Sequence, residues 1–235
     1  MRIKLFILFI LCVFSAFFYF NGHSLLGPLL QKLRGQRTVA EAFAQYSPRA
    51  EKQLKEYFYR ADAQYPPKKV VLIGLKNEKI LEVWSVEKEK PVLIHAYNVL
   101  AASGHSGPKL VEGDRQVPEG FYKIEGLNPN SSYHLSLKLN YPNQYDLEKA
   151  RLEGRENPGN NIFIHGKNAS IGCLAMGDPA IEEIFVLVNR AGRENISVII
   201  VPFDFRKTQP PENTSPEWVS GLYRKVHQEL EKYKP

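Results

Sequence analysis

The stretch Val70-Val71-Leu72-Ile73-Gly74-Leu75-Lys76-Asn77-Glu78-Lys79-Ile80-Leu81-Glu82-Val83-Trp84-Ser85-Val86 decides the fold of this chain. Its first six residues are an apolar run rich in β-branched side chains, which is typical of a buried strand. Asn77-Glu78 supplies a polar turn, and the following run returns to β-branched and aromatic residues. The stretch therefore predicts a β-hairpin.

Further short strands are expected downstream of this hairpin, with a few helices between them. No regular alternation of strand and helix is present, so a doubly wound parallel sheet is not expected. The pattern favours an α+β fold that is mostly β, built as an antiparallel β-sandwich or barrel with helices. The expected strands are 91–100, 120–124, 133–139, 161–165 and 197–202, and the expected helices are 145–152, 178–189 and 215–232.

Upstream of the hairpin the apolar residues are spaced as in an α-helix. Apolar residues recur at spacings of three and four between Thr38 and Ala63. Pro48 is expected to start a second helix there, with Ser47 as its N-cap. The chain then divides into a targeting segment at 1–20, a tether and helical segment at 21–67, a catalytic domain at 68–205 and a C-terminal helical extension at 206–235.

The N-terminus has the pattern of an export signal. Arg2 and Lys4 form a short positive region, and Leu5 to Phe20 is an almost unbroken apolar run. The residues after this run make a poor cleavage site, which favours an uncleaved anchor in the inner membrane over a removed signal peptide. Export to the periplasm or cell envelope is expected in either case.

Composition and charge narrow the class of partner. The chain has 235 residues, 43% of them hydrophobic and 24% charged, with a formal net charge of +6. These proportions are those of a globular protein. The sequence contains no dense Lys/Arg run with interleaved aromatic residues, so a nucleic-acid-binding face is not expected. The mildly positive net charge favours binding to an acidic polymer such as peptidoglycan.

A candidate nucleophile lies near residue 170. His165 and Cys173 flank one short loop, and a histidine beside a cysteine can generate a thiolate together with its own proton carrier. The other cysteine, Cys12, lies in the apolar N-terminal run, which leaves Cys173 without an intrachain partner after export. Cys173 is then expected to alkylate faster than a free thiol, at a rate that depends on His165.

The loop also offers the supporting groups that acyl transfer needs. The second imidazole nitrogen of His165 needs a partner to fix its tautomer, and Ser170 or a backbone carbonyl such as that of Gly166 is available. The backbone N–H groups of Gly172 and Cys173 are candidate oxyanion donors, because a glycine permits the dihedral angles of such a tight turn.

Two other chemistries are disfavoured. Cys173 and His165 make only two zinc ligands and no spacing supplies the others, so neither a metal nor another cofactor is expected. A serine hydrolase is disfavoured because Gly-x-Ser-x-Gly is missing. His95, His105 and His227 are interpreted as solvated or core histidines, whereas His134 is kept as a candidate.

The motifs resemble those of a known family. Ile164-His165-Gly166 and Ser170-Ile171-Gly172-Cys173 resemble the His-Gly…Ser-His-Gly-Cys signature of the L,D-transpeptidase catalytic domain (YkuD) family. Val117-Pro118-Glu119-Gly120 resembles its Thr-Pro-x-Gly stretch, and 133–136 resembles the YafK-like branch. The chain departs from the family in a shorter His–Cys gap, in Ile171 where the second His is usual, and in Ala175 where Arg is common.

The resemblance implies an envelope enzyme that acts on peptidoglycan stem peptides through a thioester on Cys173. It implies an L,D-transpeptidase, or a hydrolase that trims stem peptides or releases a peptidoglycan-linked lipoprotein. Lys109, Arg115, Tyr133 and His134 are the candidates for substrate binding, and the Gly104–Gly120 loop is expected to be a substrate wall and lid. The alternatives are a non-catalytic wall-binding scaffold on the same fold and a Cys-His protease of another fold.

Overall fold

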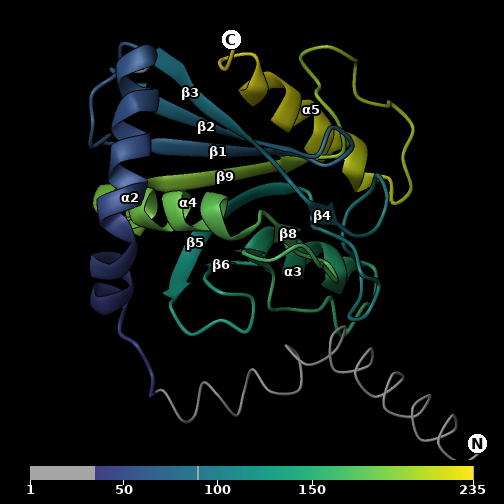
Figure 1. Cartoon of the computed structure of the whole chain (residues 1–235). Coiled ribbons are helices and arrows are strands. Elements are labelled where there is room, and N and C mark those ends of the chain that lie inside the picture. Colours follow the sequence, from purple (N-terminus) through teal and green to yellow (C-terminus); the bar gives the residue numbers. More distant parts are fainter. Residues whose placement is uncertain (1–34, 89, 235) are drawn as a thin grey trace, which may run out of the picture. The chain divides into compact units, whose positions relative to one another are not determined.

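The computed structural model describes residues 35–88 and 90–234, and Val39–Pro235 forms one compact unit (Figure 1). The expected signal or anchor at 1–20 and most of the expected tether lie outside the described residues. Among the residues that are described, no helix is both long enough and apolar enough to cross a membrane.

Within the described residues, nine strands form one sheet in the order β3-β2-β1-β9-β5-β6-β7-β8-β4. The hairpin predicted from the sequence is present as β1 and β2, which pair antiparallel from Val70↔Ser85 to Leu75↔Ile80. The strands are β1 Val70–Leu75, β2 Ile80–Glu87, β3 Lys90–Asn98, β4 Ala101–Ala102, β5 Gly120–Asn128, β6 Ser136–Leu139, β7 Phe163–His165, β8 Leu174–Ala175 and β9 Ile196–Val201.

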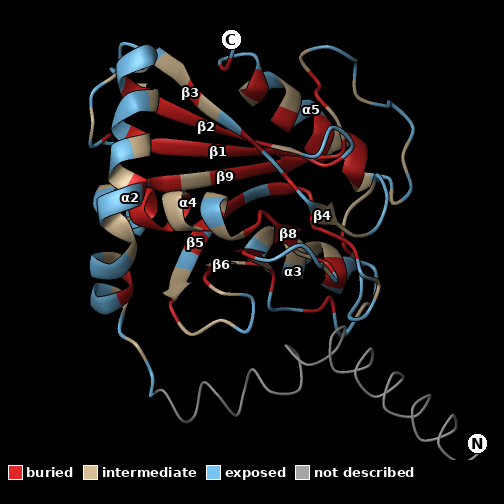
Figure 2. Cartoon of the chain, in the orientation of Figure 1, coloured by how far each residue is buried: buried red, intermediate tan, exposed pale blue. Residues whose placement is uncertain are grey.

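The sheet with its helices confirms the α+β fold class. Most neighbouring strands pair antiparallel, while β1 with β9 and β7 with β8 are parallel. All six residues of β1 are buried because both faces of this part of the sheet are covered (Figure 2). The helices are α2 Val39–Arg60, α3 Gln144–Leu152, α4 Asp178–Ala191 and α5 Trp218–Leu230, with a 3₁₀ turn at Arg193–Asn195.

Two apolar clusters hold these layers together. On one face, α2 and α4 pack against the sheet through residues such as Leu54, Phe185 and Leu72. On the other face, α5 packs through Val219 and Val226 against alternate residues of β1 and β9. Successive residues of β1 belong to the two clusters in turn, because side chains along a strand point alternately to its two faces.

The prediction of two helices before residue 63 was wrong, because α2 is continuous and contains Pro48. A proline inside a helix costs about 3 kcal/mol. Leu54 and Phe58, in the part of α2 after Pro48, are fully buried, and burial of each stabilises the fold by about 1.5–3 kcal/mol. Packing on both sides of Pro48 therefore outweighs the local break.

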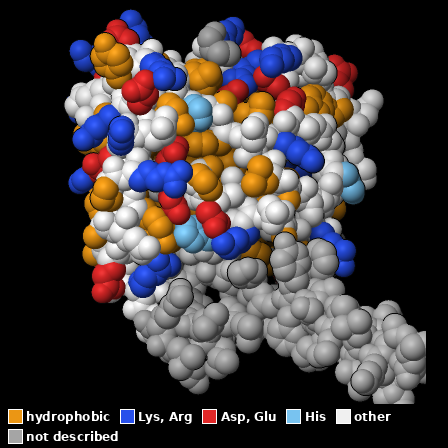
Figure 3. All heavy atoms as spheres, in the orientation of Figure 1, with side chains coloured by type: hydrophobic (Ala, Val, Ile, Leu, Met, Phe, Trp, Pro, Cys, Tyr) orange, Lys and Arg blue, Asp and Glu red, His pale blue; other side chains and the backbone are white. Residues whose placement is uncertain are grey.

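The exposed side of α2 carries ion pairs between successive turns. Lys55 with Glu51 and Arg60 with Glu56 are spaced four residues apart. On the face drawn in Figure 3, basic and acidic side chains are interspersed. Such exposed pairs contribute about 0.3–0.5 kcal/mol each.

Candidate active site

Cys173 and His165 are brought to one face of the sheet by β7 and β8. These strands are parallel, with Ile164 opposite Leu174 and His165 opposite Ala175. Continuing this register places Cys173 beside Phe163, whose backbone N–H interacts with the Cys173 thiol. Side chains two residues apart on a strand point to the same face. The thiol and the imidazole therefore project from the same face of neighbouring strands.

The His165 side chain is held in one tautomer. It is 2% exposed, and its Nδ1 lies 2.6 Å from the carbonyl oxygen of Gly166. A carbonyl can only accept, so Nδ1 carries the hydrogen and Nε2 is left as a proton acceptor. The ring of Tyr133 lies over the imidazole with the ring centroids 4.5 Å apart. Burial lowers the pKa of His165, and the hydrogen bond to Gly166 opposes this shift.

Two serine hydroxyls fix the loop before Cys173. Ser170 Oγ accepts the N–H of Cys173 at 3.0 Å and donates to its carbonyl oxygen at 2.6 Å. The N–H of Gly172 donates to Ser103 Oγ at 2.5 Å. Both expected oxyanion donors thus already bond a neutral hydroxyl. An oxyanion is the stronger acceptor, so it can replace these partners as charge develops.

Gly172 is required by its surroundings. Its φ is +89°, and an added Cβ would lie 3.3 Å from the carbonyl oxygen of Gln116. Ser103 links the same two segments. Its Oγ accepts the Gly172 N–H, and its hydroxyl donates to the carbonyl oxygen of Arg115 at 2.8 Å. Sequence reasoning missed Ser103, which belongs to no motif. Only the pairing of β4 with β8 brings it beside the Cys173 loop.

The cations expected to meet a substrate carboxylate have different surroundings. Lys109 is buried, and its Nζ donates to Asp114 at 2.6 Å and to the carbonyl of Val111. It therefore braces its own loop, while its positive charge still favours the Cys173 thiolate. The Arg115 side chain is exposed, and its backbone has a φ of +57°.

Tyr133 and His134 precede the sheet rather than lying in it. The strand expected from residue 133 begins only at Ser136, because His134 has a φ of +76°. His134 Nε2 lies 2.8 Å from Glu182 of α4, and its ring packs edge-on against Tyr46 of α2. His134 thus joins two helices, and its neighbour Tyr133 covers the imidazole of His165.

The Gly104–Gly120 loop is braced by a buried ion pair. Lys76 Nζ lies 2.7 Å from Glu119 Oε1, with the two side chains 5% and 0% exposed. The same carboxylate accepts the Gly107 N–H at 2.9 Å and the Tyr223 hydroxyl of α5. These bonds suit a fixed wall. They do not suit the lid expected from the sequence, because opening would leave charges buried without partners.

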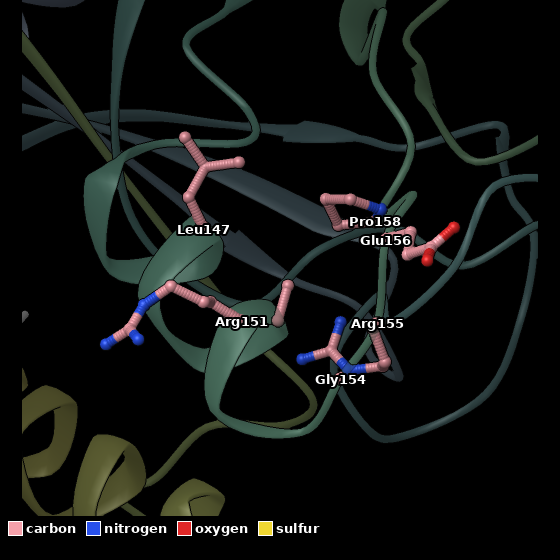
Figure 4. Close-up of a pocket in the computed structure, with 7 residues that line it drawn as sticks. Leu147, Arg151, Gly154, Arg155, Glu156 and Pro158 are labelled. Carbon is pink, nitrogen blue, oxygen red and sulfur yellow. The ribbon is translucent and has the colours of Figure 1, made fainter.

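A hollow of about 390 Å³ lies between α3 and the segment that follows it (Figure 4). Leu147 and Arg151 of α3 line it on one side, and Arg155 and Pro158 line it on the other. The guanidinium of Arg155 donates to the carbonyl of Leu110 at 2.6 Å and to Glu153. Arg155 therefore supports the loop that carries Lys109.

The protonation of Cys173 gives a testable pH dependence. Burial raises the pKa of its thiol, which works against the fast alkylation suggested by the sequence. A raised pKa keeps the thiol protonated at neutral pH, so we expect iodoacetamide to modify Cys173 more slowly than free cysteine at pH 7. The alkylation rate should still be rising with pH at about 8.5, the ordinary pKa of a cysteine thiol. Mass spectrometry of the modified chain measures it, and a plateau already reached at pH 7 would contradict the shift.

Comparison with known proteins identifies the family. The sequence profile of YkuD, the L,D-transpeptidase catalytic domain, matches residues 68–200. The chain belongs to the L,D-transpeptidase catalytic domain family. The matched segment contains β1 to β8, almost all of β9, and both His165 and Cys173.

Individual relatives are similar over part of their length. Two Escherichia coli proteins, from strains K12 and O157:H7, each named "Putative L,D-transpeptidase YafK", are 38% identical over 133 residues. The match covers 54% of this chain, which spans about half (52%) of each relative. The helical cell shape determining protein Pgp2 from Campylobacter jejuni has a TM-score of 0.48 at 21% identity, covering 76% of this chain and 62% of Pgp2. Bd1075 from Bdellovibrio bacteriovorus has a TM-score of 0.44 at 16% identity, covering 72% and 57%.

Proposed function

We propose that this chain is a cysteine acyltransferase of the cell envelope that acts on peptidoglycan stem peptides. The observation that carries the proposal is the shared face of Cys173 and His165, with His165 Nδ1 bonded to Gly166 so that Nε2 is the acceptor. Family membership supports the substrate class.

Each step follows from these atoms. The Cys173 thiol gives its proton to His165 Nε2 as sulfur bonds to the carbonyl carbon at the L-centre of diaminopimelate. Backbone N–H groups of Gly172 and Cys173 stabilise the oxyanion in exchange for their serine partners. The imidazolium then protonates the departing amine as the carbon–nitrogen bond breaks, leaving a thioester.

The second half-reaction returns the enzyme. An amine or a water molecule attacks the thioester carbonyl and gives its proton to His165 Nε2. The imidazolium returns this proton to sulfur as the carbon–sulfur bond breaks, which regenerates the Cys173 thiol. Attack by an amine is transpeptidation. Attack by water trims a stem peptide or releases a wall-linked lipoprotein. Ile171, which is 72% exposed, places an apolar side chain two residues before Cys173.

Incubation of the full-length chain with purified sacculi and with tetrapeptide muropeptides tests this function. Mass spectrometry is expected to show new products, and the Cys173→Ala variant is expected to form none. Incorporation of an added D-amino acid indicates transfer, whereas gain of water indicates hydrolysis. A wild-type chain that binds sacculi without changing them would instead favour the non-catalytic scaffold. Equal activity of the variant would contradict Cys173 as the nucleophile.

A further inference from the structure

Ser103 brings a hydroxyl group next to Cys173. It directly follows β4, which pairs antiparallel with β8, and Ala102 of β4 is opposite Leu174 of β8. Continuing this register places Ser103 opposite Cys173. Residues directly opposite each other on antiparallel strands carry their side chains on the same face of the sheet. The Ser103 hydroxyl and the Cys173 thiol therefore lie on one face.

Ser103 and His165 flank Cys173 from opposite sides. Strand β8 lies between β7 and β4 in the sheet, and β7 carries His165. A carbonyl carbon attacked by the thiol would thus have a base on one side and a hydroxyl on the other. Acyl transfer needs these groups apart, because the base serves the leaving group while the oxyanion forms on a different substituent of the same carbon.

The Ser103 hydroxyl occupies a position next to the expected oxyanion. Its Oγ accepts the Gly172 N–H at 2.5 Å, and its own hydrogen is donated to the carbonyl oxygen of Arg115 at 2.8 Å. A substrate oxygen that is stabilised by the Gly172 N–H must come within about 3 Å of the same nitrogen atom. Two oxygen atoms beside one N–H are neighbours, so Oγ and the oxyanion would lie within hydrogen-bond reach of each other.

The hydrogen of this hydroxyl can change partners at low cost. Rotation about the Cβ–Oγ bond turns the O–H away from the Arg115 carbonyl and toward the oxyanion. A hydrogen bond to a charged acceptor is about twice as strong as one to a neutral acceptor. The hydrogen bond between Ser103 and Arg115 is exposed, so water can take the place of the hydroxyl at that carbonyl. Ser170 differs, because its hydroxyl bonds both the N–H and the C=O of Cys173 and so closes the turn itself.

We propose that Ser103 is a catalytic residue whose hydroxyl donates a hydrogen bond to the oxyanion formed at the attacked carbonyl. The inference rests on the proposed function for the reaction at Cys173. As sulfur bonds to the carbonyl carbon, the carbonyl π electrons move to oxygen, which accepts from the Gly172 N–H and the Ser103 O–H. When the carbon–nitrogen bond breaks, these electrons re-form the carbonyl and the hydroxyl returns to Arg115. Ser103 loses no proton in this cycle.

A comparison of acylation with alkylation at Cys173 tests this role. p-Nitrophenyl acetate acylates a thiol through an oxyanion, whereas iodoacetamide alkylates it at a saturated carbon and forms none. For Ser103→Ala we expect the acylation rate constant to fall about 10- to 10²-fold, because only the two backbone donors remain, while the alkylation rate is unchanged. Release of p-nitrophenolate by the full-length chain, less the release by Cys173→Ala, measures acylation. Mass spectrometry measures alkylation.

Two further variants separate the hydroxyl from the fold of its loop. Ser103→Thr keeps the hydroxyl and should be acylated at nearly the wild-type rate. Ser106→Ala is the matched control, because it removes an exposed serine hydroxyl of the same loop, one that donates to Asn77 at 3.3 Å. It should leave both rates unchanged.

The ester reaction also distinguishes this inference from the proposed function, because it needs no peptidoglycan. A wild-type chain that the ester acylates but that leaves muropeptides unchanged would count against the proposed substrate class, and the Ser103 result would stand. Equal acylation of Ser103→Ala and the wild type, or a parallel loss of acylation and alkylation, would overturn the role of Ser103. So would Ser103→Thr that is acylated as slowly as Ser103→Ala, or a wild type that shows no Cys173-dependent acylation.

Discussion

Replacing His165 with alanine is expected to lower kcat/KM for stem-peptide acylation by about 10²- to 10⁴-fold, because the thiol loses its proton acceptor and the leaving amine its proton donor. Cys173 cannot compensate, since burial raises the pKa of its thiol and little thiolate forms without the imidazole at neutral pH. Initial rates of muropeptide turnover, followed by mass spectrometry, measure the loss.

Two controls sharpen this result. His165→Gln retains an N–H that can reach the Gly166 carbonyl but has no base, so it should be as inactive as alanine. His227→Ala, on α5, should keep the wild-type rate. Burial lowers the pKa of His165, so its neutral form persists below pH 6.5 and the acid limb of the wild-type pH profile should lie below that value. Substantial activity in His165→Gln, or an acid limb above pH 6.5, would contradict the assignment of the base.

Replacing Glu119 with alanine is expected to lower the free energy of unfolding by about 3–5 kcal/mol, since it leaves the Lys76 ammonium buried without its counter-ion. Burial already lowers the pKa of Lys76, and Glu119 is the main influence that opposes this shift. A lowered folded-state pKa gives a stability contribution that is present at high pH and lost as the pH falls. The deficit should therefore shrink as the pH rises towards the ordinary lysine value of about 10.4.

Denaturant unfolding of the two chains at pH 7 and pH 9.5 measures this effect. Glu56→Ala is the matched control, because it removes a glutamate from an exposed pair with Arg60 and should cost less than about 1 kcal/mol. Lys76→Met combined with Glu119→Leu should recover much of the loss, because it removes both buried charges. A single Glu119 variant as stable as the Glu56 control would show that the pair does not hold the loop.

Several parts of the fold could be predicted because their signals are local. The β1–β2 hairpin has alternating or continuous apolar runs around a polar turn, and the helix at α3 follows an asparagine that forms a capping box with Asp146. Pro48 misled the prediction of α2, because a local helix-breaking signal was outweighed by burial of Ala42, Leu54 and Phe58.

The candidate site likewise contains some residues that could be predicted from local sequence and others that could not. His165, Gly172 and Cys173 are close in the chain, so their association could be inferred from one loop. Ser103 and the Gly166 carbonyl could not be selected from the sequence. The first directly follows the distant strand β4, and the second was one of several acceptors available to the imidazole. Lys109 stays a candidate for substrate binding, and its ion pair with Asp114 of its own loop could not be foreseen from the sequence.

The sequence by itself determined the α+β class and the family resemblance, and it singled out Cys173 and His165 as the candidate pair, because each depends on residue types at short spacing. The tertiary structure alone decided which atoms surround that pair. Strand order places Ser103 beside Gly172 and Tyr133 over the imidazole. These contacts join residues far apart in the chain, and only the packing and register of the complete sheet specify them.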